Sequence, residues 1–355
     1  MNAQLESVLI VRLSAMGDII HAMPAVSALR EALPSQKIGW LIEERWADLL
    51  CAQSSPRFGS RSPQRPLVDQ VHTVDTKRWR KSLLASATRS EFFSSIAELK
   101  VAHYDAAIDF QGLMRSAIFA RLSGAKNRYG FAQPRESAAR WFYTSVVTAK
   151  GTHVIEQNLS LAQSIVETPL KITPAQFPRD EEAEHKVEVE LRQRNIRKFA
   201  ILNPGAGWGA KQWPSDRYGA VAKKLAQAGL QSLINFGPGE ETLAQEVADK
   251  SGGVAQPISL SLAELIALTR RASLFIGGDT GPMHLAAALG IPVVAIFGPT
   301  NPARNGPFSP RSIVLRNPAS ITDHSRHAAP EAGLLQISVE QVTAAAHQLL
   351  GSPHE

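Results

Sequence analysis

Cysteine and long apolar runs are nearly absent from this chain of 355 residues. The single cysteine, Cys51, can form no internal disulfide, so the fold does not depend on an oxidising compartment and the cytosol is the default location. No stretch approaches the roughly 20 apolar residues that cross a bilayer. The first apolar run, Val8 to Val11, is too short for a signal-peptide core. We therefore expect any membrane contact to be peripheral.

Motifs for metal, dinucleotide and nucleic-acid binding are also missing. There is no Asp-x-Asp pair, and the 10 histidines lack the spacing of metal ligands, so we expect no metal site. The loop after the first predicted strand has one glycine in place of G-x-G-x-x-G, which disfavours a nicotinamide-dependent oxidoreductase. The formal charge of +6 suits an acidic ligand. No DNA- or RNA-binding signature accompanies it, and we expect no nucleic-acid partner.

The sequence does contain an alternation of short apolar strands and helical patterns, which is typical of parallel sheets covered by helices. A proline-rich run and a charge block, 168–182, interrupt the alternation and indicate a linker. We predict an α/β protein with two doubly wound, Rossmann-like domains, 1–170 and 181–330, with a cleft between them. An amphipathic helix follows at 338–351. The predicted strands are 8–13, 38–42, 71–74, 106–110, 199–202, 232–236, 274–276 and 293–297, and predicted helices include 83–99 and 135–143.

The segment 272–298, ASLFIGGDTGPMHLAAALGIPVVAIFG, predicts a strand, a glycine turn, a helix and a second strand. Gly277, Gly278 and Gly281 let the backbone bend sharply and approach a ligand, and Pro282 suits the first helical turn. Free N–H groups at the helix start favour a phosphate or diphosphate. An ordinary turn would need only one glycine or a capping Asp, so we favour an anion site.

Three further segments follow predicted strands, where ligands bind in open α/β sheets. In 11–18, VRLSAMGD, Asp18 is either a helix N-cap or a general base for a substrate hydroxyl. In 203–214, NPGAGWGAKQWP, the glycines can present backbone donors and Lys211 a positive charge to a diphosphate, while Trp213 is interpreted as a core residue. In 235–241, Glu240 is either a ribose ligand or a first-turn acid that complements the helix dipole.

A basic stretch in the first half is a candidate surface for an anionic partner. It comprises Arg57, Arg61, Arg65, Lys77, Arg78, Arg80 and Lys81, with Asp69 and Asp75 between them. Such runs are usually solvated faces, and the loop 53–66 has the composition of a mobile segment. We favour a functional role, because basic groups near a cleft would capture an acidic ligand and hold the protein against an anionic membrane.

Taken together, these segments resemble the bacterial heptosyltransferases that build the inner core of lipopolysaccharide. The resemblance rests on VRLSAMGD, YDAAIDFQGLMRS, NPGAGWGAKQWP and GGDTGPMHLAAALGIP, which occur in family order. DFQGLMRSA, PRESAARWFYT and HVIEQN resemble the heptosyltransferase I branch most. The resemblance implies a glycosyltransferase-B fold whose C-terminal helix crosses back to the first domain.

The resemblance also implies the substrates and the site residues. The donor would be ADP-L-glycero-D-manno-heptose, with no cofactor, and the acceptor would be Kdo-lipid A at the cytoplasmic face of the inner membrane. Asp18 and Lys211 are then the catalytic candidates. The donor-site candidates are Gly205, Gly207, Glu240, Asp279, Thr280, Gly281 and His284, although His284 and His21 also suit packing or supporting roles. The acceptor-site candidates are Ser14, Met16, Gly17, Arg61, Arg65, Lys77, Arg78, Gln111 and Arg115, of which Arg115 is the best candidate for a carboxylate ligand.

The expected function is inverting transfer of heptose to a Kdo hydroxyl. Four alternatives stay open at this stage. The chain could be a heptosyltransferase II that acts on a core already carrying heptose, a nucleotide-sugar epimerase, or a noncatalytic nucleotide-sugar-binding module. A Rossmann oxidoreductase is the least favoured alternative.

Overall fold

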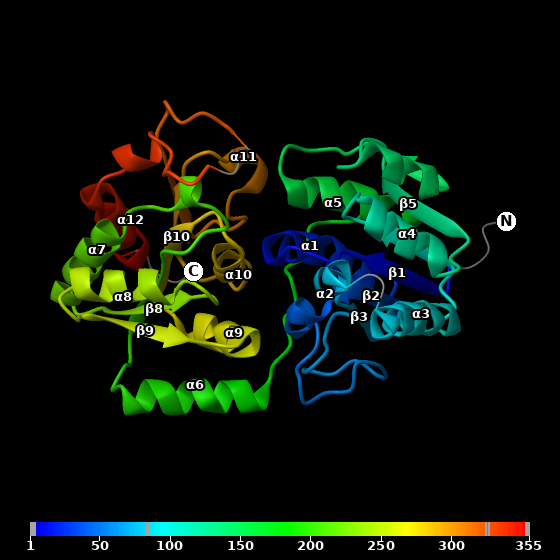
Figure 1. Cartoon of the computed structure of the whole chain (residues 1–355), viewed down its shortest axis with the longest axis horizontal. Helices are drawn as coiled ribbons and strands as arrows, with labels where there is room; N and C mark the ends of the chain where they lie inside the picture. The colour runs from blue at the N-terminus through cyan, green and yellow to red at the C-terminus, as the bar shows by residue number, and fades with distance from the viewer. Residues whose placement is uncertain (1–4, 83–84, 324, 326, 352–355) are drawn as a thin grey trace. The chain divides into compact units, whose positions relative to one another are not determined.

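The chain folds into two compact units, Met1–Asp180 and Glu181–Glu355. The structure, a computed structural model, describes residues 5–82, 85–323, 325 and 327–351. Each unit contains one six-stranded sheet whose neighbouring strands are parallel, with helices on its two faces (Figure 1). The predicted α/β class with two Rossmann-like domains is confirmed.

The first unit has the strand order β3-β2-β1-β4-β5-β6. Its strands are β1 (Ser7–Val11), β2 (Lys37–Glu43), β3 (Gln70–Val74), β4 (Ala106–Asp109), β5 (Asn127–Phe131) and β6 (Ser145–Val147). Its helices are α1 (Met16–Ala32), α2 (Thr76–Lys81), α3 (Ser86–Val101), α4 (Met114–Leu122) and α5 (Val154–Ala162), with 3-10 helices η1 (Glu44–Leu49), η2 (Ser137–Phe142) and η3 (Gln163–Ile165). Every residue of β1 is buried, as its uninterrupted apolar sequence predicts for a central strand of a parallel sheet.

The second unit repeats the same order as β12-β11-β10-β7-β8-β9. Its strands are β7 (Phe199–Asn203), β8 (Gln231–Phe236), β9 (Ala255–Ser259), β10 (Leu274–Gly278), β11 (Val293–Phe297) and β12 (Ser312–Arg316). Its helices are α6 (Glu181–Gln193), α7 (Ser215–Gln227), α8 (Glu241–Lys250), α9 (Leu262–Arg271), α10 (Gly281–Ala288), α11 (Pro302–Asn305) and α12 (Val339–Gly351), with η4 (Gly209–Lys211) and η5 (Leu334–Gln336). In both units the order reverses beside the first strand, which is where doubly wound sheets bind ligands.

Four strands were missed by the sequence pattern: β5, β6, β9 and β12. They lie at or next to the ends of the two sheets, and their sequences are partly polar and partly exposed, so they lack a continuous apolar run. The predicted helix 135–143 is the 3-10 helix η2. The predicted start of the helix 83–99 lies outside the described residues, and α3 continues to Val101.

The charge block that indicated a linker is instead the first turn of α6. Glu181, Glu182 and Glu184 lie there, where carboxylates complement the positive end of the helix dipole. The preceding residues belong to the first unit, because the Asp180 carboxylate accepts a hydrogen bond from the backbone N–H of Gln53 at 3.0 Å.

The C-terminal helix α12 packs within the second unit. Its apolar face, formed by Val342, Ala345, Ala346 and Leu349, is buried in the core that also contains residues of α7 and α8. The apolar stripe of α12 finds its apolar partners in α7 and the adjacent strands. The expected crossing of this helix back to the first domain stays a prediction.

Candidate active site

Four of the loops singled out in the sequence leave the carboxyl ends of strands, and they do so in adjacent pairs. In the first unit, the loops after β1 and β4 are neighbours because these two strands pair in parallel. In the second unit, the same holds for the loops after β7 and β10. Each unit therefore gathers its motifs at the point where its strand order reverses.

Asp18 lies in the first turn of α1, and two arginines share its carboxylate. Arg12 Nη2 lies 2.8 Å from Oδ1. Arg135 contacts both oxygens, with Nη2 2.9 Å from Oδ1 and Nη1 3.2 Å from Oδ2. The backbone N–H of Ala15, the N-cap of α1, lies 3.4 Å from Oδ2. Asp18 is therefore near the helix cap without being the N-cap, and it is the centre of an ion cluster.

The two arginines differ in burial. Arg12 is 3% exposed and donates a further hydrogen bond to the carbonyl of Phe110 at 2.6 Å, so its guanidinium is fixed between β1 and β4. Arg135 is 44% exposed and comes from the loop between β5 and η2. Burial alone would raise the pKa of Asp18, but the positive charges of Arg12 and Arg135 outweigh it and hold the pKa below its usual range. The carboxylate is thus ionised throughout the neutral range.

The acceptor candidates of the loop after β4 lie next to this cluster. Arg115 Nη2 donates to Ser14 Oγ at 3.1 Å, and its Nη1 lies 3.4 Å from Thr76 Oγ1. Arg115 and Ser14 are half-buried, as is Gly17, whereas Met16 is buried. Gln111 is 2% exposed, and its amide oxygen accepts a hydrogen bond from Leu13 N at 2.7 Å. Gln111 therefore supports the end of β1, while Arg115 remains the better placed cation.

Lys211, Asp279 and His284 form the ion cluster of the second unit. Lys211 Nζ lies 2.6 Å from Asp279 Oδ2, and His284 Nε2 lies 3.1 Å from Asp279 Oδ1. Burial opposes ionisation of Asp279, but the hydrogen bond to His284 and the charge of Lys211 keep its pKa below the usual range. The ammonium group of Lys211 also lies 4.3 Å from the centre of the Trp208 ring. Asp279 therefore fixes the direction of the lysine.

Helix α10 begins at Gly281, two residues after Asp279. Its N-cap Thr280 makes no side-chain capping bond, because its hydroxyl is directed to the carbonyl of Gly278 at 3.3 Å. The residues from Asp279 to Pro282 are partly exposed. Backbone N–H groups in the first turn of such a helix suit an anion. Gly277 and Gly278, predicted to form the turn, are instead the last residues of β10, so the strand is longer than its apolar run indicated.

The glycines of the loop after β7 serve different purposes. A Cβ on Gly205 would lie 2.3 Å from both carboxylate oxygens of Glu240, and one on Gly209 would lie 1.6 Å from the carbonyl oxygen of Ala328. Gly207 has open space around it. Glu240 is the N-cap residue of α8, and its carboxylate accepts a hydrogen bond from Gly237 N at 2.8 Å. Glu240 and the glycine loop are thus brought together, and Gly207 is the glycine that a ligand can approach.

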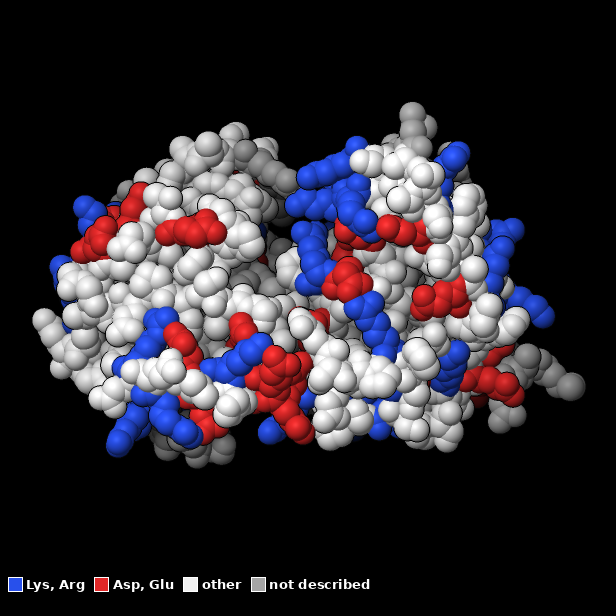
Figure 2. All heavy atoms as spheres, turned by 60° about the horizontal axis from the view of Figure 1, so that its bottom comes forward, with Lys and Arg blue, Asp and Glu red and all other residues white. Residues whose placement is uncertain are grey.

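Several side chains of the predicted basic surface of the first unit form hydrogen bonds or ion pairs within the unit. Arg65 is 2% exposed and donates to the carbonyls of Val68, Ser60 and Pro56, so its predicted role in acceptor binding is corrected. Arg61 lies 3.7 Å from Asp69. Arg78 pairs with Asp75 at 3.2 Å and also with Glu91. Lys77 is exposed, and Figure 2 shows Lys and Arg side chains of this unit interleaved with Asp and Glu.

Sequence reasoning missed the two arginines that hold Asp18. Arg12 had a signal, because an arginine at the end of an apolar strand needs a buried partner. Arg135 had none, since it lies 117 positions from Asp18 and its neighbours predicted a helix.

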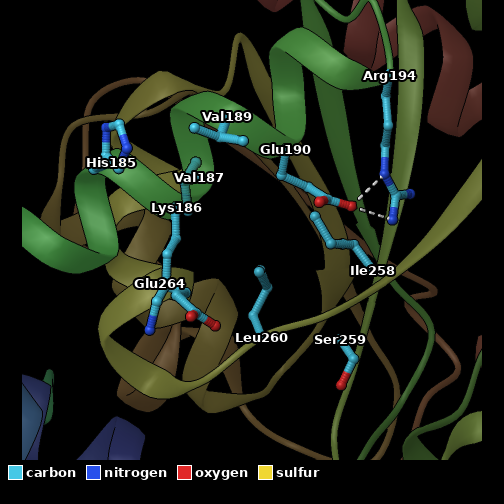
Figure 3. A pocket seen from close by; sticks show the side chains of 10 residues that line it. All are labelled: His185, Lys186, Val187, Val189, Glu190, Arg194, Ile258, Ser259, Leu260 and Glu264. Atoms are coloured by element: carbon cyan, nitrogen blue, oxygen red, sulfur yellow. Dashed lines mark hydrogen bonds and ion pairs between the residues drawn. The ribbon is translucent and has the colours of Figure 1, made fainter.

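A pocket of about 610 Å³ in the second unit was not predicted either. Figure 3 shows it between α6 and the loop that joins β9 to α9. Its charged residues Glu190 and Arg194 are paired at 2.6 Å, and Arg194 also donates to the carbonyl of Pro257 at 3.0 Å. Proline at position 257 and this arginine cap the outer edge of β9, which protects the sheet from pairing with another strand.

Within the described ranges, no group of three or more His, Cys, Asp or Glu side chains is arranged to hold a metal ion. None of the helices in the described part of the chain combines the length and apolar character needed to cross a bilayer.

The chain is similar to known glycosyltransferases in both sequence and structure. Residues 92–333 match glycosyltransferase family 9 (heptosyltransferase). Lipopolysaccharide heptosyltransferase 1 of Pseudomonas aeruginosa is 29% identical over 312 residues, which cover 87% of this chain and 83% of that protein. Lipopolysaccharide heptosyltransferase 3 of Escherichia coli is 26% identical over 294 residues, with 80% and 81% covered.

A solved structure agrees over the full length. The structure described as E. coli heptosyltransferase WaaC with ADP superimposes with a TM-score of 0.78 at 26% identity, covering 97% of this chain and 99% of that one.

Proposed function

Because this chain belongs to glycosyltransferase family 9, the heptosyltransferases, we propose that it transfers L-glycero-D-manno-heptose from ADP-heptose to a Kdo hydroxyl of Kdo-lipid A. It is a glycosyltransferase of the glycosyltransferase-B fold, and its relatives are heptosyltransferases of the lipopolysaccharide core. The finer assignment, addition of the first heptose, is supported by the relatives named heptosyltransferase 1. A relative named heptosyltransferase 3 leaves the acceptor position as the part to be tested.

The observation that carries the proposal is the pairing of motifs at the reversal point of each sheet. The second unit combines an uncapped helix start with a lysine held in place by Asp279, an arrangement suited to a diphosphate. The first unit presents an ionised carboxylate, Asp18, beside the cation Arg115. ADP in the structure of the E. coli relative is consistent with a nucleotide diphosphate handle.

The proposed reaction is a single displacement with inversion at the anomeric carbon. The acceptor oxygen forms a bond to that carbon while the bond to the diphosphate oxygen breaks, and the electron pair leaves with ADP. Asp18 receives the proton of the attacking hydroxyl. The sugar carries oxocarbenium character at the transition state.

Negative charge then grows on the departing diphosphate, where fixed donors are most effective. We assign its stabilisation to the first-turn N–H groups of α10 and to Lys211. The ammonium of Lys211 has three donors and directs two of them to Asp279, one to Oδ2 and one to the backbone carbonyl. Gly207 can bring backbone close to the same group, and Glu240 remains the ribose candidate. No cofactor enters this scheme, so transfer is expected to persist in the presence of a chelator.

The proposed acceptor is an anionic lipid-linked sugar. Arg115 is the proposed ligand of its carboxylate, because it is half-buried and lies beside Ser14 in the Asp18 loop. Such an acceptor places the protein at the cytoplasmic face of the inner membrane, held there peripherally.

Transfer from ADP-heptose to Kdo-lipid A, with and without a preinstalled heptose, tests the proposal. We expect product on the acceptor that lacks heptose. Product only on the heptosylated acceptor would move the assignment to a later step of core synthesis. Turnover of ADP-heptose without any acceptor, to an epimer, would replace the transferase by an epimerase, and binding without turnover would leave only a binding module.

A further inference from the structure

Trp141 is the most exposed large apolar side chain of the described residues, with 84% of its surface accessible. It lies in η2, between Arg140 and Phe142. By contrast, Ala139, two positions earlier in η2, is completely buried. Isolated exposed apolar residues are common, so exposure alone does not indicate a partner.

The charge around Trp141 is what distinguishes it. Residues 110–150 contain seven basic residues but only one acidic residue, Glu136. Within the described part of the chain, Arg121, Lys126 and Arg140 are exposed and form no ion pair with a carboxylate. This contrasts with the stretch 57–78, where Arg57, Arg61 and Arg78 each have an acidic partner.

Four basic residues that precede Trp141 in the chain, together with Trp141 itself, are here called the Trp141 patch: Arg121, Lys126, Arg128, Arg140 and Trp141. Arg128 Nε donates to the carbonyl of Phe142 at 2.8 Å, and its Nη1 donates to the carbonyls of Ala125 at 2.8 Å and Lys126 at 3.1 Å. Partial burial and the nearby charge of Arg121 lower the pKa of Arg128.

The patch stands on a rigid base. The hydroxyl of Tyr143, two residues after Trp141, donates to the buried carboxylate of Asp109 at 2.7 Å. At the other end of η2, the backbone N–H of Glu136 donates to the carbonyl of Gly112 at 2.9 Å. The exposed position of Trp141 is therefore set by contacts on both sides of η2.

We propose that the Trp141 patch docks this protein on the surface of an anionic lipid bilayer, with the indole of Trp141 at the level of the headgroups. Unpaired cations complement anionic headgroups, and an indole, with its apolar body and polar N–H, suits the boundary between water and lipid. A single ring without a second stacking partner is a poor platform for single-stranded nucleic acid. The inference rests on the proposed function, because a lipid-linked acceptor is found at such a surface.

The docked segment also reaches the candidate active site. Arg135, which contacts Asp18, lies two residues before the start of η2. A bilayer that binds η2 would therefore also restrain the preceding loop, which carries Arg135, an ion-pair partner of Asp18. This connects membrane contact with the position at which an acceptor headgroup is received.

Vesicle co-sedimentation of the full-length protein tests the inference, using phosphatidylcholine vesicles with and without phosphatidylglycerol. We expect binding only with phosphatidylglycerol. The double variant Arg121→Ala/Arg140→Ala should bind about 30-fold more weakly, and Trp141→Ala about tenfold more weakly. Trp141→Phe should abolish the blue shift of tryptophan fluorescence that accompanies binding.

Matched controls come from α3. Phe93→Ala removes another aromatic side chain, 66% exposed, and Arg89→Ala/Lys100→Ala removes two exposed cations. We expect these variants to bind as the parent does. The proposal is overturned if the Trp141 and Arg121/Arg140 variants retain full binding, or if Lys77→Ala/Arg80→Ala/Lys81→Ala loses binding in their place. Association of the protein with itself through Trp141, without vesicle binding, would also overturn it.

A soluble acceptor that lacks the lipid separates this inference from the proposed function. Trp141→Ala should transfer heptose to that acceptor at the parental rate and lose transfer only to the vesicle-embedded acceptor. If no heptose is transferred by any variant but vesicle binding still depends on Trp141, the docking surface stands and the proposed reaction is wrong.

Discussion

At the scale of single residues, the first unit is dominated by the charge balance at Asp18. Its carboxylate is shared by a buried arginine, Arg12, and an exposed one, Arg135. An ionised carboxylate is ready to accept a proton, but one held by two guanidinium groups is a weak base. Because Arg135 is the exposed member, it is the partner that an approaching substrate can displace.

Replacing Asp18 by Asn should lower turnover by roughly 100- to 10,000-fold, because no general base would remain at this position. The change should leave the affinity for ADP nearly unaltered, since the donor residues lie in the second unit. Steady-state kinetics and calorimetric titration with ADP measure the two effects. Asn also leaves Arg12 without its counter-charge, so a thermal melt must accompany the kinetics. Near-normal turnover of a folded variant would remove Asp18 from the mechanism.

Replacing Arg135 by Gln should raise the pKa of Asp18, since one of its two positive neighbours is lost. The base must be ionised, so the acid limb of the pH profile of kcat/KM should move to higher pH. The dependence of the free energy of unfolding on pH should also change. A depressed carboxylate pKa stabilises the fold above the unfolded pKa, and this contribution is lost as pH falls, so the variant should lose less on acidification.

Arg89→Gln is the control for this prediction, because Arg89 is an exposed cation on α3 with no carboxylate partner among the described residues. Its pH profile should superimpose on that of the parent. An unchanged acid limb in Arg135→Gln would mean that the ion pair with Asp18 does not govern the base.

At the scale of elements, helix α12 shows how packing chooses between equivalent partners. Its apolar stripe would suit either unit, but Val342 and Ala346 are both fully buried in the core of the second. The indole of Trp213 reinforces this arrangement, donating to the carbonyl of Ile337 just before the helix at 3.0 Å. The packing of α12 therefore contributes to the stability of the second unit.

Ala346→Asp should destabilise the second unit by about 3 kcal/mol or more, because it places an unpaired charge in a closed core. Ala344→Asp makes the same chemical change on the exposed side of the same helix and should cost no more than about 0.5 kcal/mol. Urea denaturation followed by far-UV circular dichroism measures both. Equal stability of the two variants would contradict the packing of α12 described above.

At the scale of the whole molecule, the chain consists of two units, Met1–Asp180 and Glu181–Glu355, each with its own sheet and its own buried core. Units with separate cores can unfold in separate steps, and a ligand stabilises the unit that binds it. The proposed donor residues Lys211, Glu240 and Asp279 all belong to the second unit. The proposed base belongs to the first.

Calorimetry should therefore resolve two unfolding transitions, and ADP should raise the midpoint temperature of only one of them. At an ADP concentration of 100 times Kd, the free energy of unfolding of that unit should increase by about 2.7 kcal/mol. Ala346→Asp should lower the midpoint temperature of the same transition that ADP shifts upward. Lys211→Ala should abolish most of the ADP effect. A single transition, or an ADP effect on the transition that Ala346→Asp leaves unchanged, would contradict the assignment of donor binding to the second unit.

The sequence by itself determined the α/β class, the central strands and the loops that carry the candidate site. These follow from local rules: apolar runs form buried strands, glycine-rich turns follow them, and parallel strands bring their carboxyl ends to one edge. Asp18, Lys211 and Asp279 could be singled out for this reason. The strands β5, β6, β9 and β12 could not, because partly exposed strands need no continuous apolar run.

Only the tertiary structure decided which charges meet. The pairing of Asp18 with Arg135 spans 117 positions, the burial of Arg65 depends on three carbonyls that its own loop turns toward it, and α12 could have packed on either unit. A sequence pattern indicates which charged or apolar side chains need a partner in the folded protein. Which partner is found depends on distances that exist only once the chain has closed into its sheets.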